Sequence, residues 1–210
     1  VEVNYTLGGA EYTQKVLVSA PDDILIIELS TTAKNGMDFS LRLDRPKDEG
    51  HSTVSISNPS SSTISMKGEV TQYGGRKHSQ PAPLDYGVKF ETILKAENEG
   101  GSVTAKAGTL ILKGVKKATL KLIANTSFYV EDFEKKNKEE LNRLSGVQYK
   151  DIYKKHVRDH QKYFNRVNLE LGDQSVANLP TDLRLQNVAN GTEDPRLVAD
   201  LFQFVRYLLI

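Results

Sequence analysis

Cysteine is missing from this sequence of 210 residues. The chain therefore forms no disulfide and offers no thiolate metal ligand and no cysteine nucleophile. It also has no run approaching the roughly 20 apolar residues that a membrane-spanning helix needs. Its 28 Lys and Arg residues nearly balance its 27 Asp and Glu residues, so the formal net charge is +1. This balance gives no reason to expect nucleic acid or an anionic membrane as a partner.

Signatures of catalytic centres are also lacking. The serine-rich stretch SNPSSSTIS has no G-x-S-x-G elbow, so a serine hydrolase is not supported. The pairs Gly8-Gly9, Gly74-Gly75 and Gly100-Gly101 precede no predicted helix, which excludes them as phosphate loops. Carboxylates are numerous, but the sequence pairs no two of them across a sugar-sized cleft. We therefore expect no catalytic residue, no metal and no cofactor within these residues.

Residues 1–128 have the apolar period of two that is typical of strands. VEVNY at 1–5 and MDFSLRL at 37–43 alternate, and DILIIEL at 23–29 is a nearly continuous apolar run, as in a strand covered on both faces. NPSSS at 58–62 is predicted to be a turn between two strands. Strands that recur every 8–12 residues or so between turn residues are typical of an antiparallel β-sandwich.

One segment breaks this pattern. TQYGGRKHSQPAPLDYG, at 71–87, contains two prolines and three glycines and has no strand alternation. It predicts a long loop, and long loops in compact domains are often functional. The alternative is an exposed connection between two strands.

After residue 128 the period becomes helical. In VQYKDIYKKHVRDHQKYFNRV the spacing of three and four is kept by Ile152, His156, Asp159, Tyr163 and Val167. Thr181 is the predicted N-cap of a helix that runs to about Ala189. Asp194-Pro195 begins the last helix with proline in its first turn. We assign 1–128 to the sandwich, 129–180 to a helical linker and 181–210 to the start of an all-helical domain.

Two features of these helices need an explanation. EDPRLVADLFQFVRYLLI, at 193–210, is apolar on most sides, and such a helix is expected to be buried on most sides. His156 and His160 are four residues apart, a spacing that places two imidazoles on one side of a helix, as a zinc site requires. No third ligand is evident. The alternative is that one histidine packs or forms a hydrogen bond at a contact between helix and sandwich.

Several strings resemble glycoside hydrolase family 95, the inverting α-L-fucosidases and their α-L-galactosidase relatives. They are VNYTLGGAEYTQKVLVSAPDDILIIELS, FSLRLDRP, GVKFETILKA, HVRDHQKYFNRVNLELG and LPTDLRLQNVANGTEDPRLVADLFQFVRYLLI. Their order and spacing cover nearly the whole chain. The resemblance implies a β-sandwich, a helical linker and an (α/α)6 barrel. It places Val1 part way into the sandwich and Ile210 at the end of the first barrel helix, which is then expected to pack on further barrel helices.

The resemblance also implies hydrolysis with inversion, in which a Glu acts as general acid and an Asn held by an Asp positions water. No motif for these residues is present, so none is assigned. Within the long loop, which is longer than the family usually has, the candidate substrate-binding residues are Tyr73, Arg76, His78 and Tyr86. Aromatic rings stack on sugar faces, and Arg and His donate hydrogen bonds to hydroxyl groups.

The implied parent protein acts on glycans and is periplasmic or secreted, in a glycan-degrading bacterium. Since Val1 is expected to be internal to a longer protein, the missing signal peptide says nothing of location. An alternative function is a stand-alone carbohydrate-binding sandwich. The all-round apolar helix argues against it, because a free module has no need of such a helix. A zinc protein built on His156 and His160 is the third hypothesis.

Overall fold

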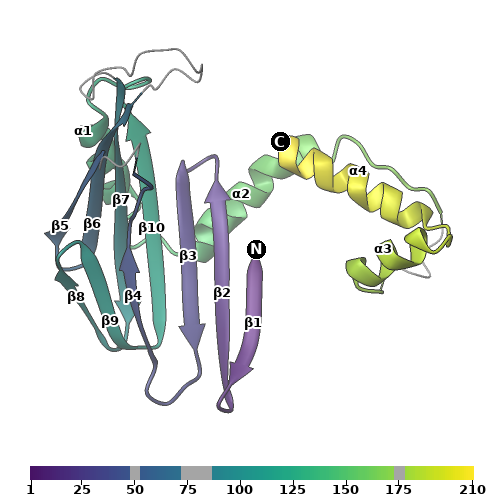
Figure 1. The fold of residues 1–210 in the computed structure, drawn as a ribbon, viewed down its shortest axis with the longest axis horizontal. Coiled ribbons are helices and arrows are strands. Elements are labelled where there is room, and N and C mark those ends of the chain that lie inside the picture. The colour runs from purple at the N-terminus through teal and green to yellow at the C-terminus, as the bar shows by residue number, and fades with distance from the viewer. Residues whose placement is uncertain (48–52, 72–86, 173–177) are drawn as a thin grey trace. The chain divides into compact units, whose positions relative to one another are not determined.

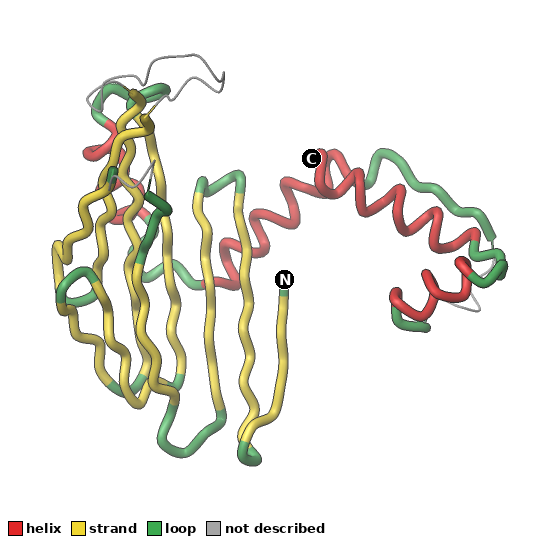
Figure 2. Tube along the Cα trace, in the orientation of Figure 1, coloured by secondary structure: helices red, strands yellow, loops and turns green. Residues whose placement is uncertain are grey.

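The structure is a computed structural model, and it describes residues 1–47, 53–71, 87–172 and 178–210. Strands occupy the first part of the chain and helices the rest, as Figure 2 shows. The chain divides into two compact units, Val1–Tyr153 and Lys154–Ile210. Each unit is described by itself.

The first unit is built from two antiparallel sheets. The larger sheet has seven strands in the order β1-β2-β3-β10-β7-β6-β5, and the smaller has three in the order β4-β9-β8 (Figure 1). The strands of the larger sheet are β1 (Glu2–Leu7), β2 (Ala10–Ser19), β3 (Ile24–Thr31), β10 (Lys117–Thr126), β7 (Gly87–Glu99), β6 (Thr63–Thr71) and β5 (Val54–Ser60). Those of the smaller sheet are β4 (Met37–Arg42), β9 (Thr109–Val115) and β8 (Ser102–Lys106). The predicted antiparallel β-sandwich is confirmed.

The two sheets pack through one face of the larger sheet. Strand alternation places Ile64, Leu94 and Leu120 on this face, and Leu110 and Leu112 of β9 pack against them. All five side chains are buried. Side chains on a strand alternate between faces, so the residues between them point to the opposite side of the larger sheet.

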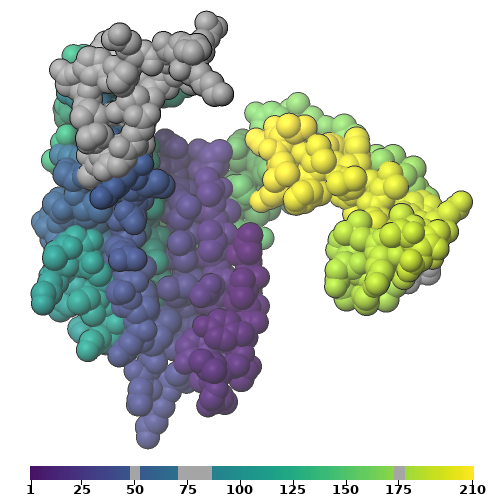
Figure 3. Space-filling model, in the orientation of Figure 1, coloured from purple at the N-terminus to yellow at the C-terminus, as the bar shows by residue number. Residues whose placement is uncertain are grey.

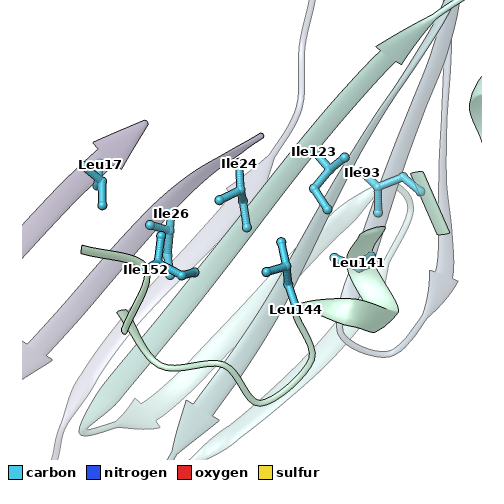
Figure 4. Close-up of a cluster of buried hydrophobic side chains, with 8 residues drawn as sticks. All are labelled: Leu17, Ile24, Ile26, Ile93, Ile123, Leu141, Leu144 and Ile152. Carbon is cyan, nitrogen blue, oxygen red and sulfur yellow. The ribbon is translucent and has the colours of Figure 1, made fainter. Parts of the chain in front are cut away.

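The opposite face carries a second core under helix α1 (Phe133–Arg143) and the first turn of helix α2 (Tyr149–Phe164). Figure 4 shows Leu141, Leu144 and Ile152 from these helical segments turned toward the strands. The strand residues of this core are Leu17, Ile24, Ile26, Ile93 and Ile123. The larger sheet is therefore covered on both faces over its central strands, which explains the continuous apolar run at 23–29.

The predicted turn at 58–62 is shorter than expected. Asn58 and Pro59 belong to β5, and the pairing with β6 shifts register between Ser57 and Ser60. Proline has no backbone N–H to give to a ladder. The Asn58 side chain bonds instead to the Thr63 carbonyl at 3.2 Å and to the Gly108 N–H at 2.7 Å. These side-chain bonds hold the irregular strand end, so the turn needs only the two residues between β5 and β6.

The second unit contains most of α2, together with α3 (Thr181–Ala189) and α4 (Pro195–Leu209). The helix to Ala189 and the start at Asp194-Pro195 are confirmed, and Asp194 caps α4 by accepting the Leu197 N–H at 2.8 Å. The predicted N-cap at Thr181 is wrong: Pro180 occupies that position and no side chain caps the helix. Proline fixes its own φ near the value found here, −54°, and so sets the entry to α3. None of the described helices has the length and apolar character to cross a membrane.

An ion network that is buried at Arg184 and Asp194 joins α3 to α4. Arg184 donates two hydrogen bonds to Asp194, at 2.8 and 2.9 Å, and one to Asp200, at 2.8 Å. Arg196 donates to the same Asp200 carboxylate at 2.7 Å. The hydrogen bonds from Arg184 hold the pKa of both carboxyl groups below the ordinary value. Because the planar guanidinium of Arg184 bonds to both carboxylates, it fixes the direction of α3 relative to α4.

Acid should loosen this pairing. A carboxyl group whose folded pKa is depressed contributes stability above its unfolded pKa, and this contribution is lost as pH falls through the folded value. The ordinary value is 3.8, so the helical unit should hold from neutral pH to about 4 and lose helix signal below that. Circular dichroism at 222 nm during acid titration measures this loss. The variant Asp194→Asn already lacks the Arg184–Asp194 ion pair, so its loss of helix signal in acid should be smaller. An unchanged loss would contradict this account.

Candidate functional site

The four candidate substrate-binding residues, Tyr73, Arg76, His78 and Tyr86, lie outside the described residues. The segment that carries them joins the end of β6, at Thr71, to the start of β7, at Gly87. The described residues around these two strand ends therefore form the first place to look for a site.

A groove of about 430 Å³ lies beside these strands and the first turn of α1. Six of its ten lining residues are polar or charged, and side chains from α1 lie beside side chains from three neighbouring strands there. The residues that line it are Thr53, Val54, Ser55, Lys67, Gly68, Glu69, Lys89, Phe90, Phe133 and Glu134. A concave surface of this size that combines apolar area with several polar groups suits a small ligand.

Lys67 is the central charge of the groove. Its ammonium group donates a hydrogen bond to Glu134 of α1 and lies 3.7 Å from Glu91 Oε1 of the neighbouring strand β7. The hydrogen bond with Glu134 raises the pKa of Lys67 above its usual range, so the side chain is charged at neutral pH. The ion pair joins β6 to the first turn of α1 across the groove, and its two side chains are 42% and 40% exposed.

A buried polar network stands behind the groove. Glu91 accepts the Ser65 hydroxyl at 2.7 Å and the Asn137 side-chain amide at 3.1 Å. Asn125 of β10 donates to Asn137 at 2.8 Å and to Glu140 at 3.1 Å. Full pairing of these buried groups fixes α1 on the sheet and hence one wall of the groove.

Sequence reasoning missed this network. Its one visible signal is the spacing of Asn137, Leu141 and Leu144, which places an amide in line with two buried leucines. The sequence around Asn137 is highly charged, so the amide looks like one more solvated residue. Its partners come from strands more than ten residues away.

The far wall of the groove is packed rather than polar. Gly68 lets the Phe90 ring approach the backbone, since a Cβ there would lie 2.7 Å from the ring. The Arg45 guanidinium lies 5.6 Å from the Phe90 ring centre, within cation–π range, and also donates to Thr53 Oγ1. This arrangement orders the strand ends that border the groove.

The two helical histidines form part of an aromatic contact. The rings of His156 and His160 are 6.0 Å apart, and His160 also lies 5.2 Å from Phe164 and 5.0 Å from Tyr207 of α4. Burial lowers the pKa of His156, and the neighbouring His160 lowers it further. Within the described parts of the chain, no three His, Asp or Glu side chains gather to hold a metal ion. The expected packing role is present for His160, although its contact is with α4 rather than with the sandwich.

Comparison with known proteins assigns both parts of the chain. The glycosyl hydrolase family 65 N-terminal domain matches residues 1–131, and the glycosyl hydrolase family 95 catalytic domain matches residues 148–210. Alpha-L-fucosidase 2 of Arabidopsis thaliana is 28% identical over 232 residues, which cover 100% of this chain and 27% of that protein. The chain thus spans about a quarter of the length of this curated relative.

A solved structure shares the fold. A protein described as putative kojibiose phosphorylase from human microbiome aligns with 78% of this chain and 23% of its own, with a TM-score of 0.50 and 10% identity. This likeness concerns architecture alone. By the match over residues 1–131, the chain belongs to the glycosyl hydrolase family 65 N-terminal domain family, and residues 148–210 are similar to the family 95 catalytic domain.

Proposed function

We propose that these residues are the non-catalytic sandwich and linker of a longer enzyme that removes terminal α-L-fucosyl, or α-L-galactosyl, residues from glycans with inversion. The catalytic residues lie outside residues 1–210, in the remainder of an (α/α)6 barrel that begins here. Inversion requires a general acid and a second group far enough away to admit a water molecule. The sandwich and linker support the barrel, and the groove beside α1 is a candidate contact for the glycan.

The surface of α4 carries this proposal. Its side chains at i, i+3, i+7 and i+10 form an apolar stripe that is between 45% and 64% exposed, made of Val198, Leu201, Val205 and Leu208. Burial of such a side chain contributes about 1.5–3 kcal/mol, so covering the stripe is strongly favourable. The stripe lies within the part that matches the family 95 catalytic domain, which makes the remaining helices of that domain its natural cover.

Another side of α4 supports the same interpretation. Arg206 donates to the carbonyl oxygens of Phe164 at 2.8 Å and Val167 at 2.6 Å, at the C-terminal end of α2. Its guanidinium also lies 4.9 Å from the Phe164 ring. A cation that satisfies the last carbonyls of a helix stabilises that end. One side of α4 is thus committed to α2, and its apolar stripe is left for other helices.

A second candidate is a stand-alone carbohydrate-binding sandwich. Tyr5 and Tyr12, on neighbouring strands, have ring centres 5.1 Å apart and planes at 5°, and Tyr5 is exposed. Flat exposed rings are the kind of surface on which sugar rings stack. This reading gives no reason for the apolar stripe of α4, so we place it second. For either function we propose a secreted or periplasmic location, where glycans are available.

Hydrolysis of 4-nitrophenyl α-L-fucoside tests the proposal. The longest natural polypeptide that contains these residues should turn over the substrate, and residues 1–210 alone should not. Proton NMR during the reaction should show the β-anomer of the released sugar first, as inversion demands. Turnover by residues 1–210 would place the catalytic residues inside them, and first release of the α-anomer would exclude inversion. If the longer polypeptide is inactive and the short chain binds fucosylated glycan, the second candidate takes its place.

A further inference from the structure

Two adjacent aromatic side chains lie exposed on the connection between β10 and α1. Phe128 is 71% exposed and Tyr129 is 86% exposed, although phenylalanine is among the residues that are most often buried. Their ring centres are 4.8 Å apart and their planes meet at 83°, the edge-to-face arrangement that aromatic side chains prefer. This aromatic pair therefore forms a defined apolar surface outside both cores of the sandwich.

Hydrogen bonds fix the backbone around the aromatic pair. The Ser127 N–H donates to the Lys89 carbonyl at 2.8 Å, and the Lys89 N–H donates to the Ser127 hydroxyl oxygen at 3.0 Å. The Val130 N–H donates to the Thr126 carbonyl at 3.2 Å, which closes a turn that contains the pair. Because the backbone is held on both sides of the two rings, a ligand that binds them has little chain left to order.

The aromatic pair borders the groove beside α1. Lys89, which is bonded to Ser127, lines this groove, and so does Phe133, where α1 begins. The pair belongs to the short connection between these two points. In the direction of Figure 3 the smaller sheet faces the viewer, so α1 lies on the far face of the larger sheet. Exposed rings and the polar groups of the groove thus adjoin on that face.

The charges that line the groove are balanced. Lys67 and Lys89 are matched by Glu69 and Glu134, and strand register places Glu69 opposite Lys89. An ammonium group has more than one N–H donor and a carboxylate more than one acceptor position, so ion pairing leaves some of them for a ligand. Complementary charge favours one partner over another. A lining without net charge therefore favours an uncharged ligand that is rich in hydroxyl groups.

We propose that the groove binds a neutral saccharide unit of the glycan, which stacks on the rings of Phe128 and Tyr129. The inference deepens the proposed function and rests on it, because the glycan is the substrate proposed there. The C–H groups on one face of a sugar ring are slightly positive and meet the negative face of an aromatic ring. Its hydroxyl groups bond to the paired charges of the groove. The volume of about 430 Å³ is within the range of small-molecule sites, roughly 300–1,000 Å³.

Other occupants fit less well. An acidic sugar would meet the carboxylates of Glu69 and Glu134 as well as the two lysines of the groove. A protein surface would require a broader apolar patch, because the core of a protein interface is depleted in charged residues. Here the exposed Glu131 and Asp132 follow the aromatic pair directly in the chain. Two rings set among charged groups are better suited to one face of a sugar ring.

An NMR titration of residues 1–210 with 2′-fucosyllactose, a neutral trisaccharide, tests this inference. Tyr129→Ala should keep the Tm, since the side chain is exposed, and should raise the Kd about fivefold through the loss of one stacked ring. Tyr129→Phe keeps the ring and should keep the Kd. The matched control Tyr153→Ala removes an exposed tyrosine from α2 and should also keep it. The anionic trisaccharide 3′-sialyllactose should bind at least about tenfold more weakly than the neutral one.

Equal Kd values for the original chain and Tyr129→Ala would overturn the inference, and so would tighter binding of 3′-sialyllactose or no saturation below about 10 mM. Loss of binding in Tyr5→Ala but not in Tyr129→Ala would overturn it by placing the sugar on β1 and β2. Hydrolysis of 4-nitrophenyl α-L-fucoside by the longer polypeptide is assayed separately. Hydrolysis without binding at the groove would keep the proposed function and remove the inference. Binding at the groove without hydrolysis would keep the inference and place the second candidate function first.

Discussion

Replacement of Lys121 by alanine is expected to destabilise the sandwich unit by about 3–5 kcal/mol, the usual effect of breaking a buried ion pair. The Lys121 side chain is 0% exposed in the middle of β10. Its ammonium group donates to Glu97 Oε2 at 2.7 Å and to the Leu144 carbonyl at 2.7 Å. Leu144 ends α1 and belongs to the core beneath it, so this one side chain ties the helix end to the sheet. Its loss removes the buried cation from the Glu97 carboxylate and one of the two donors of the Leu144 carbonyl, which keeps the Val147 N–H at 3.1 Å.

Thermal unfolding followed by circular dichroism measures the effect. For a unit of this size the loss corresponds to a fall in Tm of roughly 6–20 °C. Lys95 provides the matched control, because it lies 3.8 Å from the other oxygen of the same Glu97 but is 25% exposed. Lys95→Ala should cost less than about 1 kcal/mol, as partly exposed pairs do. Equal falls for the two variants would show that burial of Lys121 contributes nothing.

Lys121 also illustrates what the sequence hides. In KATLKLIANT, Leu120 and Leu122 alternate with Thr119 and Lys121, a pattern that indicates one buried and one solvent face. The buried face is predicted correctly. The other face is covered too, because α1 packs on β7 and β10, and no local pattern announces a helix that arrives later in the chain. Strands and helices can be predicted from local periodicity. The layer that covers the second face of a sheet is determined by tertiary packing, which local periodicity does not show.

The candidate groove could not be predicted from the sequence, for the same reason. Lys67 meets Glu91 because β6 pairs with β7 in one register, and it meets Glu134 because α1 begins beside that pair. Neither partner is near Lys67 in sequence. Conversely, the apolar stripe of α4 depends on helical spacing alone. The sequence therefore predicts both the helix and the burial of its apolar side chains. The ion network of Arg184 lies between these cases, since its residues fall in the strings that carry the family resemblance while their contacts appear in the structure alone.

Substitutions in the apolar stripe of α4 should affect the stability of residues 1–210 and of the longer polypeptide differently. Leu201→Glu combined with Leu208→Glu should leave the stability of residues 1–210 within about 0.5 kcal/mol, because both side chains are exposed there and glutamate is a good helix former. The same pair should also reduce aggregation by breaking an exposed apolar surface. In the longer polypeptide, where we propose that the stripe is covered, each buried and unpaired carboxylate should cost several kcal/mol, roughly 3–5 in comparable cases.

Two measurements compare the short and long polypeptides directly. For the short variant, the Tm and the monomer peak in size-exclusion chromatography should improve or stay level. The long variant should lose more than about 90% of its fucoside hydrolysis, since two buried carboxylates together cost roughly 6–10 kcal/mol, which is comparable to the free energy of unfolding of a whole domain. Gln186→Glu on α3 adds one carboxylate at an exposed polar position and should change neither polypeptide. If the double variant behaves alike in both lengths, the stripe faces solvent in the complete protein. The apolar helix would then need another partner, and the claim that a catalytic barrel begins at residue 181 would lose its main physical support.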